Sequence, residues 1–345
     1  MTKTEAIVGC ILGTAVGDAL GLPYEALAKR KIPININKYG LLFGKGMVSD
    51  DTEHTCIVAQ SLLVSRGDKQ IFAKALSWRL RCWLLGIPAG IGFATLRGIL
   101  KLWLGFSPEK SGVFSAGNGP AMRSAIIGVC YGDDREKMCD LVRVSTRITH
   151  RDPKAEYGAL AVAIAAYLSS QNHLTSPQEY YQTLADFLPQ KADEFLQLIQ
   201  QACNSAIREE TAATYAFNLG LKKGITGYIY HTVPVVIQVW LRQQTEYQKG
   251  IEEIIHLGGD TDTTAAILGG IIGAKVGKKG IPQQWLNDLW EFPRNVAWME
   301  ELGTRLTGTK TTALPLPIIP LLFRNLFFAF VIIIHGFSRI LFFFN

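Results

Sequence analysis

The stretch His256-Leu257-Gly258-Gly259-Asp260-Thr261-Asp262-Thr263-Thr264-Ala265-Ala266 runs on to Ala274 through Ala, Ile and Gly, which predicts a tight turn followed by a helix. Two glycines permit such a turn because glycine tolerates positive φ. The turn would direct the Asp260 and Asp262 carboxylates and the Thr263 hydroxyl toward one centre. Hard divalent cations take oxygen ligands of this kind. The stretch therefore predicts half of a metal site, although a helix N-cap at Asp260 explains it equally well on its own.

A second acidic cluster, Val48-Ser49-Asp50-Asp51-Thr52-Glu53-His54, also stands just before an apolar helical pattern, Cys56 to Val64. Its adjacent carboxylates are flanked by hydroxyls, as in the first cluster. Bringing so many carboxylates together is costly unless a cation relieves their repulsion. Two such clusters, far apart in the sequence, favour one metal site shared between two helix starts over simple capping.

Composition limits the possible classes of protein. With 345 residues, 48% hydrophobic and 19% charged, the chain can bury a substantial globular core in one large domain or two. The formal net charge of +6 is modest and the basic residues are scattered. We therefore expect no nucleic-acid partner, whereas a ligand that carries phosphate remains compatible with this charge.

The six cysteines form no CxxC pair and mostly stand in apolar helical contexts, which indicates reduced core residues and a reducing, cytoplasmic compartment. The apolar run after Glu5 contains Asp18 and lacks a convincing signal-peptide cleavage site, so we interpret it as folded protein.

Helical spacing of apolar residues recurs from the N-terminus to Leu306, and long strand-like alternations are scarce. The predicted fold class is therefore all-α. Within Ala6 to Leu20, four regularly spaced glycines predict close packing against a neighbouring helix: Gly9, Gly13, Gly17 and Gly21.

Three further segments are candidates for a ligand site. Gly117, Asn118 and Gly119 form a glycine-rich turn before a helix, which could face phosphate or ribose oxygens or could simply be a tight turn. His150 stands in a polar loop, where a structural role or one that orients a ligand is favoured. Tyr228 follows a glycine and could stack on a planar ring or pack at the edge of the core.

Together these motifs resemble the ordered signature of the ADP-ribosylglycohydrolases over about residues 4–307. The similarity is carried by five segments: Gly17-Asp18-Ala19-Leu20-Gly21 with Glu25, Ser49-Asp50-Asp51-Thr52, Gly117-Asn118-Gly119 with Met122-Arg123, Thr149-His150 and Gly258-Gly259-Asp260-Thr261-Asp262-Thr263. That family includes dinitrogenase reductase activating glycohydrolases and enzymes that remove ADP-ribose from arginine or serine.

The resemblance implies a compact all-α domain with a binuclear Mg²⁺ or Mn²⁺ centre in a cleft. By position, one set of metal ligands would be Ser49, Asp50 and Asp51, and the other Asp260, Asp262 and Thr263. Ser49 replaces the family's usual Thr and keeps the hydroxyl oxygen. The resemblance further places ribose and diphosphate at residues 117–119 and an aromatic, approximately Tyr228, near the substrate. His231 stands where acidic residues are frequent in the family.

The resemblance thus implies metal-dependent hydrolysis of the glycosidic bond that joins ADP-ribose to a protein side chain or another conjugate. Glu25 is the candidate carboxylate that acts with water or the leaving group, or that gates the cleft, and Asp50 and Asp260 are further catalytic candidates. Asp18 would support the site. The alternative is a non-catalytic or structural member of the family that binds ADP-ribose, which the retention of every carboxylate opposes.

The expected organisation is a catalytic domain at residues 1–307, a linker at 308–317 and a hydrophobic tail at 318–345. In the tail, the interval between Arg324 and Arg339 is shorter than the roughly 20 residues of a spanning helix, and the polar residues share one side of a helical wheel. An interfacial membrane anchor is our first interpretation. A tilted span with snorkelling arginines, or a helix that covers an apolar groove on this chain or a partner, remain open.

Overall fold

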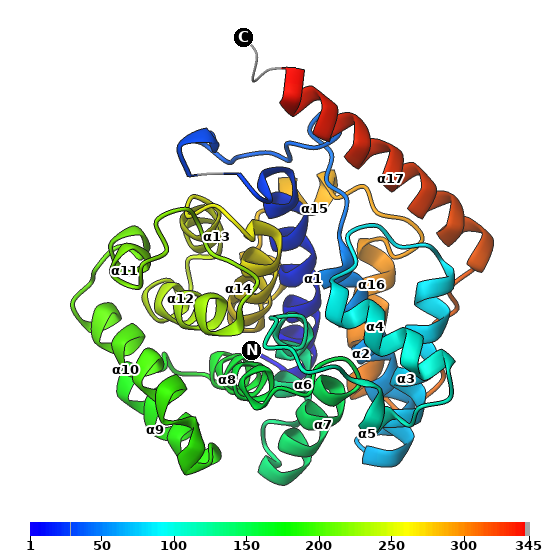
Figure 1. Ribbon diagram of the computed structural model, residues 1–345, viewed down its shortest axis with the longest axis horizontal. Helices are drawn as coiled ribbons and strands as arrows, with labels where there is room; N and C mark the ends of the chain where they lie inside the picture. Colours follow the sequence, from blue (N-terminus) through cyan, green and yellow to red (C-terminus); the bar gives the residue numbers. More distant parts are fainter. Residues whose placement is uncertain (28, 342–345) are drawn as a thin grey trace.

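The protein is built from helices in the part that a computed structural model describes, residues 1–27 and 29–341, and this part contains no sheet (Figure 1). Pairing of the sheet type is limited there to isolated bridges. The predicted all-α fold is confirmed. The α-helices are α1 (Lys3–Gly21), α2 (Asp50–Ser65), α3 (Lys69–Leu85), α4 (Phe93–Trp103), α5 (Pro108–Ser111), α6 (Ala125–Tyr131), α7 (Arg135–Arg147), α8 (Pro153–Ser169), α9 (Pro177–Phe187), α10 (Asp193–Ile207), α11 (Ala212–Asn218), α12 (Ile229–Arg242), α13 (Tyr247–Ile255), α14 (Thr261–Val276), α15 (Gln283–Asp288), α16 (Val296–Thr307) and α17 (Ile318–Leu341).

The centre of the fold is the antiparallel pair of α1 and α14 (Figure 1). Their backbones touch through glycines: a Cβ atom added to Gly13 would lie 2.1 Å from the carbonyl oxygen of Gly269, and one added to Gly9 would lie 2.1 Å from that of Gly273. No side chain larger than hydrogen fits there. The close packing predicted from the glycine spacing of α1 is confirmed.

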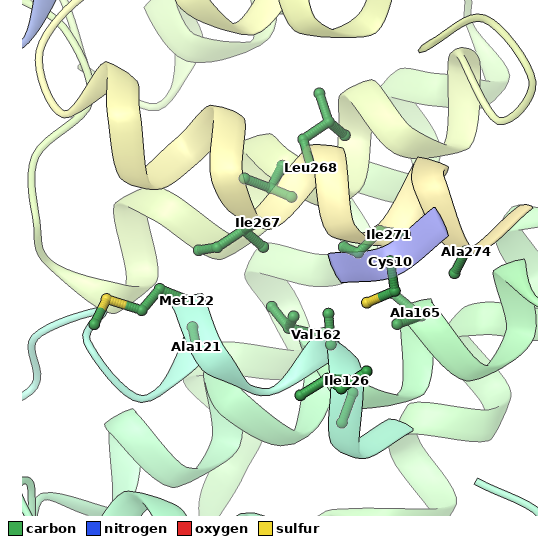
Figure 2. Packing of buried hydrophobic residues seen from close by; sticks show 14 of the residues in the cluster. Cys10, Ala121, Met122, Ile126, Val162, Ala165, Ile267, Leu268, Ile271 and Ala274 are labelled. Atoms are coloured by element: carbon green, nitrogen blue, oxygen red, sulfur yellow. The ribbon is translucent and has the colours of Figure 1, made fainter. Parts of the chain in front are cut away.

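Apolar side chains from other helices close around this pair. Figure 2 shows Cys10 of α1 and Ile271 of α14 beside Val162 of α8 and Ile126 of α6. Because α1 and α14 are antiparallel, the C-terminal end of α1 lies beside the N-terminal end of α14. Asp18 and the acidic turn before α14 are thereby brought to the same end of the core.

The segment at residues 308–317 contains no helix, but it is bonded to the domain that precedes it. Gln60 donates a hydrogen bond to the Leu314 carbonyl at 3.3 Å, and Arg66 donates to the Thr309 carbonyl at 2.7 Å. The segment therefore fixes where α17 starts.

The tail helix α17 lies across one edge of the molecule (Figure 1) and contacts the body through polar side chains and through buried apolar ones such as Phe328, which packs with Leu22 and Met47. Arg324 pairs with Glu291 at 2.6 Å and also donates to the Val48 carbonyl at 2.6 Å. Asn325 donates to the Gly86 carbonyl at 2.7 Å, and the His335 ring lies 3.0 Å from the Pro23 carbonyl oxygen. Three residues on the polar side of the predicted helical wheel, Arg324, Asn325 and His335, are thus turned toward protein. The side chains of Ser338 and Arg339, which belong to the same side, and the final residues, 342–345, lie outside the described part of the chain.

Two described helices are long and apolar enough to cross a membrane. One is α1, with its following turn, which is 94% buried and forms the core. The other is α17, which is only 28% buried over residues 318–337. Length and composition alone therefore do not distinguish a spanning helix from a core helix in this protein.

The contact between α1 and α14 should not tolerate a methyl group. We expect Gly13→Ala to lower the free energy of unfolding by about 3 kcal/mol, because overpacking of a rigid backbone contact cannot relax. The matched control is Gly336→Ala in α17, where no atom lies within 4 Å of the added Cβ. The control should leave stability unchanged or raise it by up to about 1 kcal/mol. Equal losses in urea unfolding would contradict the close contact.

The buried pair of Arg324 and Glu291 should matter mainly when one partner is removed. We expect Arg324→Met to lower the free energy of unfolding by about 3–5 kcal/mol, because it leaves the Glu291 carboxylate buried and unpaired. The double variant Arg324→Met/Glu291→Gln should lose less than the sum of the two single variants by about 1–3 kcal/mol. Strict additivity in this double-mutant cycle would refute the coupling.

Candidate active site and metal centre

The turn before α14 directs its carboxylates as the sequence predicts. Gly258 and Gly259 have φ of +74° and +84°, which confirms the expected positive φ, and a Cβ atom on Gly259 would lie 2.0 Å from the Ile225 carbonyl oxygen. Asp260 occupies the N-cap position of α14, but its side chain does not cap the helix. Its carboxylate instead accepts a hydrogen bond from the Asn118 side chain at 2.6 Å. Capping therefore does not account for Asp260.

The start of α2 meets the start of α14 at Asp51. Ser49 caps α2 by accepting a hydrogen bond from the Asp51 N–H, and its hydroxyl donates to Asp51 Oδ2 at 3.0 Å. The Thr263 hydroxyl donates to the same oxygen at 3.2 Å. The two acidic clusters, more than 200 residues apart in the sequence (|i−j| = 212), thus lie in contact.

Asp18 supports this junction from the end of α1. Its carboxylate accepts hydrogen bonds from the Ser49 N–H, at 3.0 Å to each oxygen, and from the Thr52 N–H and hydroxyl at 3.1 and 2.5 Å. Burial raises the pKa of Asp18 to about 6, although these hydrogen bonds lower it. Asp18 therefore holds the first turn of α2 in place beside α14.

The carboxylates at the junction are poorly compensated by the protein. Burial, reinforced by neighbouring carboxylates, raises the pKa of Asp50, Asp51 and Asp262 well above its usual range, and burial also raises the pKa of Asp260. Asp51 Oδ1 is buried and has no hydrogen-bond partner among the described residues. A cation relieves this kind of repulsion, since it stabilises the charged forms.

The donor set fits a hard divalent cation, but not through acidic side chains alone. Within residues 1–27 and 29–341, no three His, Cys, Asp or Glu side chains are arranged to hold a metal ion by themselves. In this arrangement Asp51 faces the hydroxyls of Ser49 and Thr263, and Asp262 accepts from the Thr263 N–H at 2.9 Å. Hydroxyl oxygens therefore belong to the candidate ligand set, which is made of oxygen throughout.

A cavity of about 340 Å³ opens above these carboxylates. Ser49 and Asp51 are buried beneath it. Tyr228 is not one of the described residues that line it; this side chain packs against the core, with its hydroxyl 3.2 Å from Lys154 Nζ. The walls of the cavity combine acidic and hydroxyl side chains with the glycine-rich loop and exposed Phe93. The acidic clusters contribute Glu25, Asp50, Asp260, Asp262 and Thr263, and the other lining residues include Phe93, Thr95, Ser115, Gly117, Asn118, Gly119, His150 and Gly227.

The glycine-rich loop is fixed to the acidic turn and rests on His150. Asn118 donates from its backbone to the Gly227 carbonyl at 3.0 Å and from its side chain to Thr232 at 3.0 Å as well as to Asp260. A Cβ atom on Gly117 would lie 3.0 Å from the imidazole of His150. The loop therefore presents backbone, not side chains, to the cavity at Gly117 and Gly119.

His150 is 3% exposed, and its Nδ1 lies 2.9 Å from the Thr149 hydroxyl. Burial, together with the charge of Arg123, lowers the pKa of His150 to about 3. The imidazole is therefore neutral at physiological pH. It can hydrogen-bond to a ligand without contributing positive charge.

A layer of buried charge beneath α2 was not predicted from the sequence. Glu53 pairs with Arg294 at 2.5 Å and accepts from the Trp83 indole at 2.6 Å. Glu291 accepts from the Val48 N–H at 3.2 Å, while Arg324 donates to the Val48 carbonyl. The residue before Ser49 is thus held at both its backbone polar groups. The sequence signal that could have indicated this buried charge is Glu53, followed by His54, at the start of an apolar helix. Phe93 is 85% exposed and lines the cavity, and no sequence signal identified it.

Stability of the metal-free protein should fall as pH rises. The unfolded pKa of Asp is about 3.9, and that of folded Asp18 is about 6. A raised folded pKa contributes stability that is present below the unfolded value and lost as pH rises through the folded value. Asp50, Asp51 and Asp262 shift in the same direction, so thermal unfolding in EDTA should show a falling midpoint above pH 4.

Mg²⁺ or Mn²⁺ should reverse this fall, because a cation bound only by the folded state stabilises it by mass action. Asp51→Asn should flatten the pH profile in EDTA and lose the response to cation. Identical pH profiles with and without cation would count against a metal centre at this junction.

Comparison with known proteins identifies the family. The family model for ADP-ribosylglycohydrolase matches residues 1–314. The chain is 30% identical to an uncharacterized protein of Archaeoglobus fulgidus, over 88% of this chain and 96% of that protein. It is 26% identical to the ADP-ribosyl-[dinitrogen reductase] glycohydrolase of Rhodospirillum rubrum, over 83% and 90%. It is 28% identical to ADP-ribosylhydrolase ARH3 of Gallus gallus, over 80% and 87%.

A solved structure described as an ADP-ribosylglycohydrolase-related protein complex has the same fold, with a TM-score of 0.58 and 24% identity over 88% of this chain and 97% of that one. The resemblance seen in the motifs is therefore confirmed over nearly the whole chain. The chain belongs to the ADP-ribosylglycohydrolase family.

Proposed function

We propose that the protein is a metal-dependent hydrolase that cleaves the glycosidic bond between ADP-ribose and an arginine or serine side chain, or a related ADP-ribose conjugate. Family membership and the relatives named as glycohydrolase and ADP-ribosylhydrolase support ADP-ribosyl hydrolase activity. The observation that carries the proposal is the contact between the two acidic clusters at Asp51, beneath a cavity walled by the glycine-rich loop.

We assign two divalent cations, Mg²⁺ or Mn²⁺, to the oxygen atoms around Asp51. The α2 side would supply Ser49, Asp50 and Asp51, and the α14 side Asp260, Asp262 and Thr263. When bound, such ions act as Lewis acids that orient ribose hydroxyls and lower the pKa of water. Asp51 Oδ1, which has no hydrogen-bond partner in the described part of the chain, supports this assignment, because a buried carboxylate oxygen otherwise loses its solvation without compensation.

Substrate would lie between the glycine-rich loop and the carboxylates. Gly117 and Gly119 line the cavity with backbone and lie close to His150, since a Cβ atom at either position would meet its imidazole, and we assign ribose and diphosphate to this backbone. Neutral His150 lies beneath the loop and positions it. The backbones of Tyr228 and Gly117 form a bridge, and on this proximity we assign the Tyr228 ring to contact with a planar group of the substrate.

Glu25 is exposed at the cavity and is the carboxylate that we assign to proton transfer with water or the leaving group. Its negative charge contributes to the raised pKa of Asp262 and Asp50, so the three carboxylates interact. Asp50 and Asp260 also line the cavity. We assign them to catalysis through the cations that they would hold beside the reacting bond. The alternative, a non-catalytic protein that binds ADP-ribose, uses the same cavity and predicts binding without cleavage.

We place the enzyme in a reducing, cytoplasmic compartment, where its partners are ADP-ribosylated proteins or ADP-ribose conjugates. The six cysteines support this, because all are free. The tail offers a contact with a membrane surface, since α17 is the described apolar helix that the core does not bury.

The direct test is release of ADP-ribose from arginine-linked and serine-linked substrates in Mg²⁺, Mn²⁺ or EDTA. We expect release to require the cation and to be lost in Asp260→Ala/Asp262→Ala, whereas Glu25→Gln should lower kcat by about 10²–10⁴-fold. The control is Asp133→Ala, whose side chain is 66% exposed in a surface pair with Lys3. Tight binding of ADP-ribose with no release from any conjugate would favour the non-catalytic alternative.

A further inference from the structure

The outer face of α17 is apolar and uncovered. Phe323, Phe330, Ile333 and Phe337 are 70%, 58%, 56% and 63% exposed. The helix has 24 residues, which at the usual rise per residue corresponds to about 36 Å. Soluble monomers seldom expose a continuous apolar surface of this extent. The helix also lies beyond residue 314, where the match to the family ends.

Aromatic side chains of the body extend this face. The Trp290 ring is 56% exposed and lies 6.0 Å, edge to face, from the Phe327 ring. Phe292 is 54% exposed and lines a hollow of about 760 Å³ together with Phe323 and Phe327. Aromatic residues of this kind are enriched where protein meets the membrane–water interface.

A basic loop adjoins the same helix. Residues 29–47 contain five basic residues and no Asp or Glu: Lys29, Arg30, Lys31, Lys38 and Lys45. Leu41 of this loop packs with Phe328 and Ile332 of α17. Ile34 and Phe43 are 88% and 100% exposed in the loop. Positive charge and exposed apolar side chains therefore occur together beside the helix.

Two carboxylates near this surface are paired within the protein. Asp288 pairs with Lys45 at 2.6 Å, so that this pair adds no net charge, and Glu291 is buried against Arg324. Residues 308–345 contain no Asp or Glu. The positive field fits an anionic lipid surface, whereas it opposes a second copy of the chain, because a symmetric contact through this face would bring two basic loops together.

We propose that α17 and the loop 29–47 form a composite surface that binds anionic phospholipid membranes, with α17 in the plane of the interface. The bonds of Arg324, Asn325 and His335 to the body hold the helix by its polar side, so its apolar side faces outward and lies along the bilayer. A spanning orientation would break all three contacts. This property is independent of the hydrolase activity.

The test is sedimentation of the full-length protein with vesicles of phosphatidylcholine alone or phosphatidylcholine mixed with phosphatidylserine. We expect preferential binding to the anionic vesicles that weakens with salt. Phe330→Glu/Ile333→Glu should weaken it at least about ten-fold, since apolar burial is lost. Lys29→Gln/Lys38→Gln should weaken it about twenty-five-fold on anionic vesicles only, because each lysine near such a surface contributes about five-fold.

The matched control is Phe217→Glu on α11, where an equally exposed phenylalanine (60%) lies away from α17 in the fold. It should bind as the wild type does. The unfolding midpoint and ADP-ribose release report whether the glutamate variants remain folded. If they do not, a milder pair, Phe330→Ala/Ile333→Ala, tests the same face. The proposal is overturned by absence of vesicle binding, by equal binding of all variants, or by a lipid-free dimer that the α17 variants abolish.

Discussion

The antiparallel contact between α1 and α14 is the constraint on which the rest of the structure depends. Its glycines let two backbones approach until only hydrogen atoms separate them from facing carbonyl oxygens, so the register of the pair has almost no freedom. That register places Asp18, at the end of α1, beside the acidic turn that starts α14. The position of the candidate site is therefore set by packing in the apolar core.

A second constraint comes from charge buried beneath α2. Asp18 fixes the backbone of Ser49 and Thr52, while Glu291 and Arg324 fix the preceding residue, Val48. The carboxylates that face the cavity can therefore remain close together although they repel one another. Because Arg324 belongs to α17, the tail helix contributes directly to the rigidity of the segment that carries half of the candidate metal ligands.

Much of the site could be predicted because its chemistry is local in sequence. Acidic residues beside hydroxyls, with paired glycines before a helix, are typical of a site that binds a cation. The order of these motifs along the chain then supplied the family resemblance, which implied which residues are ligands. The ion pairs of Glu53 and Glu291 were not predicted, since their partners lie about 240 and 33 residues away and no local pattern links them. Tyr228 shows the reverse: a local pattern suggested contact with substrate, whereas the fold packs its side chain against the core, and substrate contact stays a prediction.

The sequence by itself determined the all-α class, the glycine contact face of α1 and the two acidic helix starts, because periodicity and residue type act over a few neighbouring positions. Only the tertiary structure decided that Asp51 joins the two clusters, that Asp260 does not cap its helix and that α17 turns its polar side inward. These outcomes depend on which distant groups compensate a buried charge or hydrogen-bonding atom. That compensation is a property of the packed chain, since it exists only when segments far apart in sequence exclude water together.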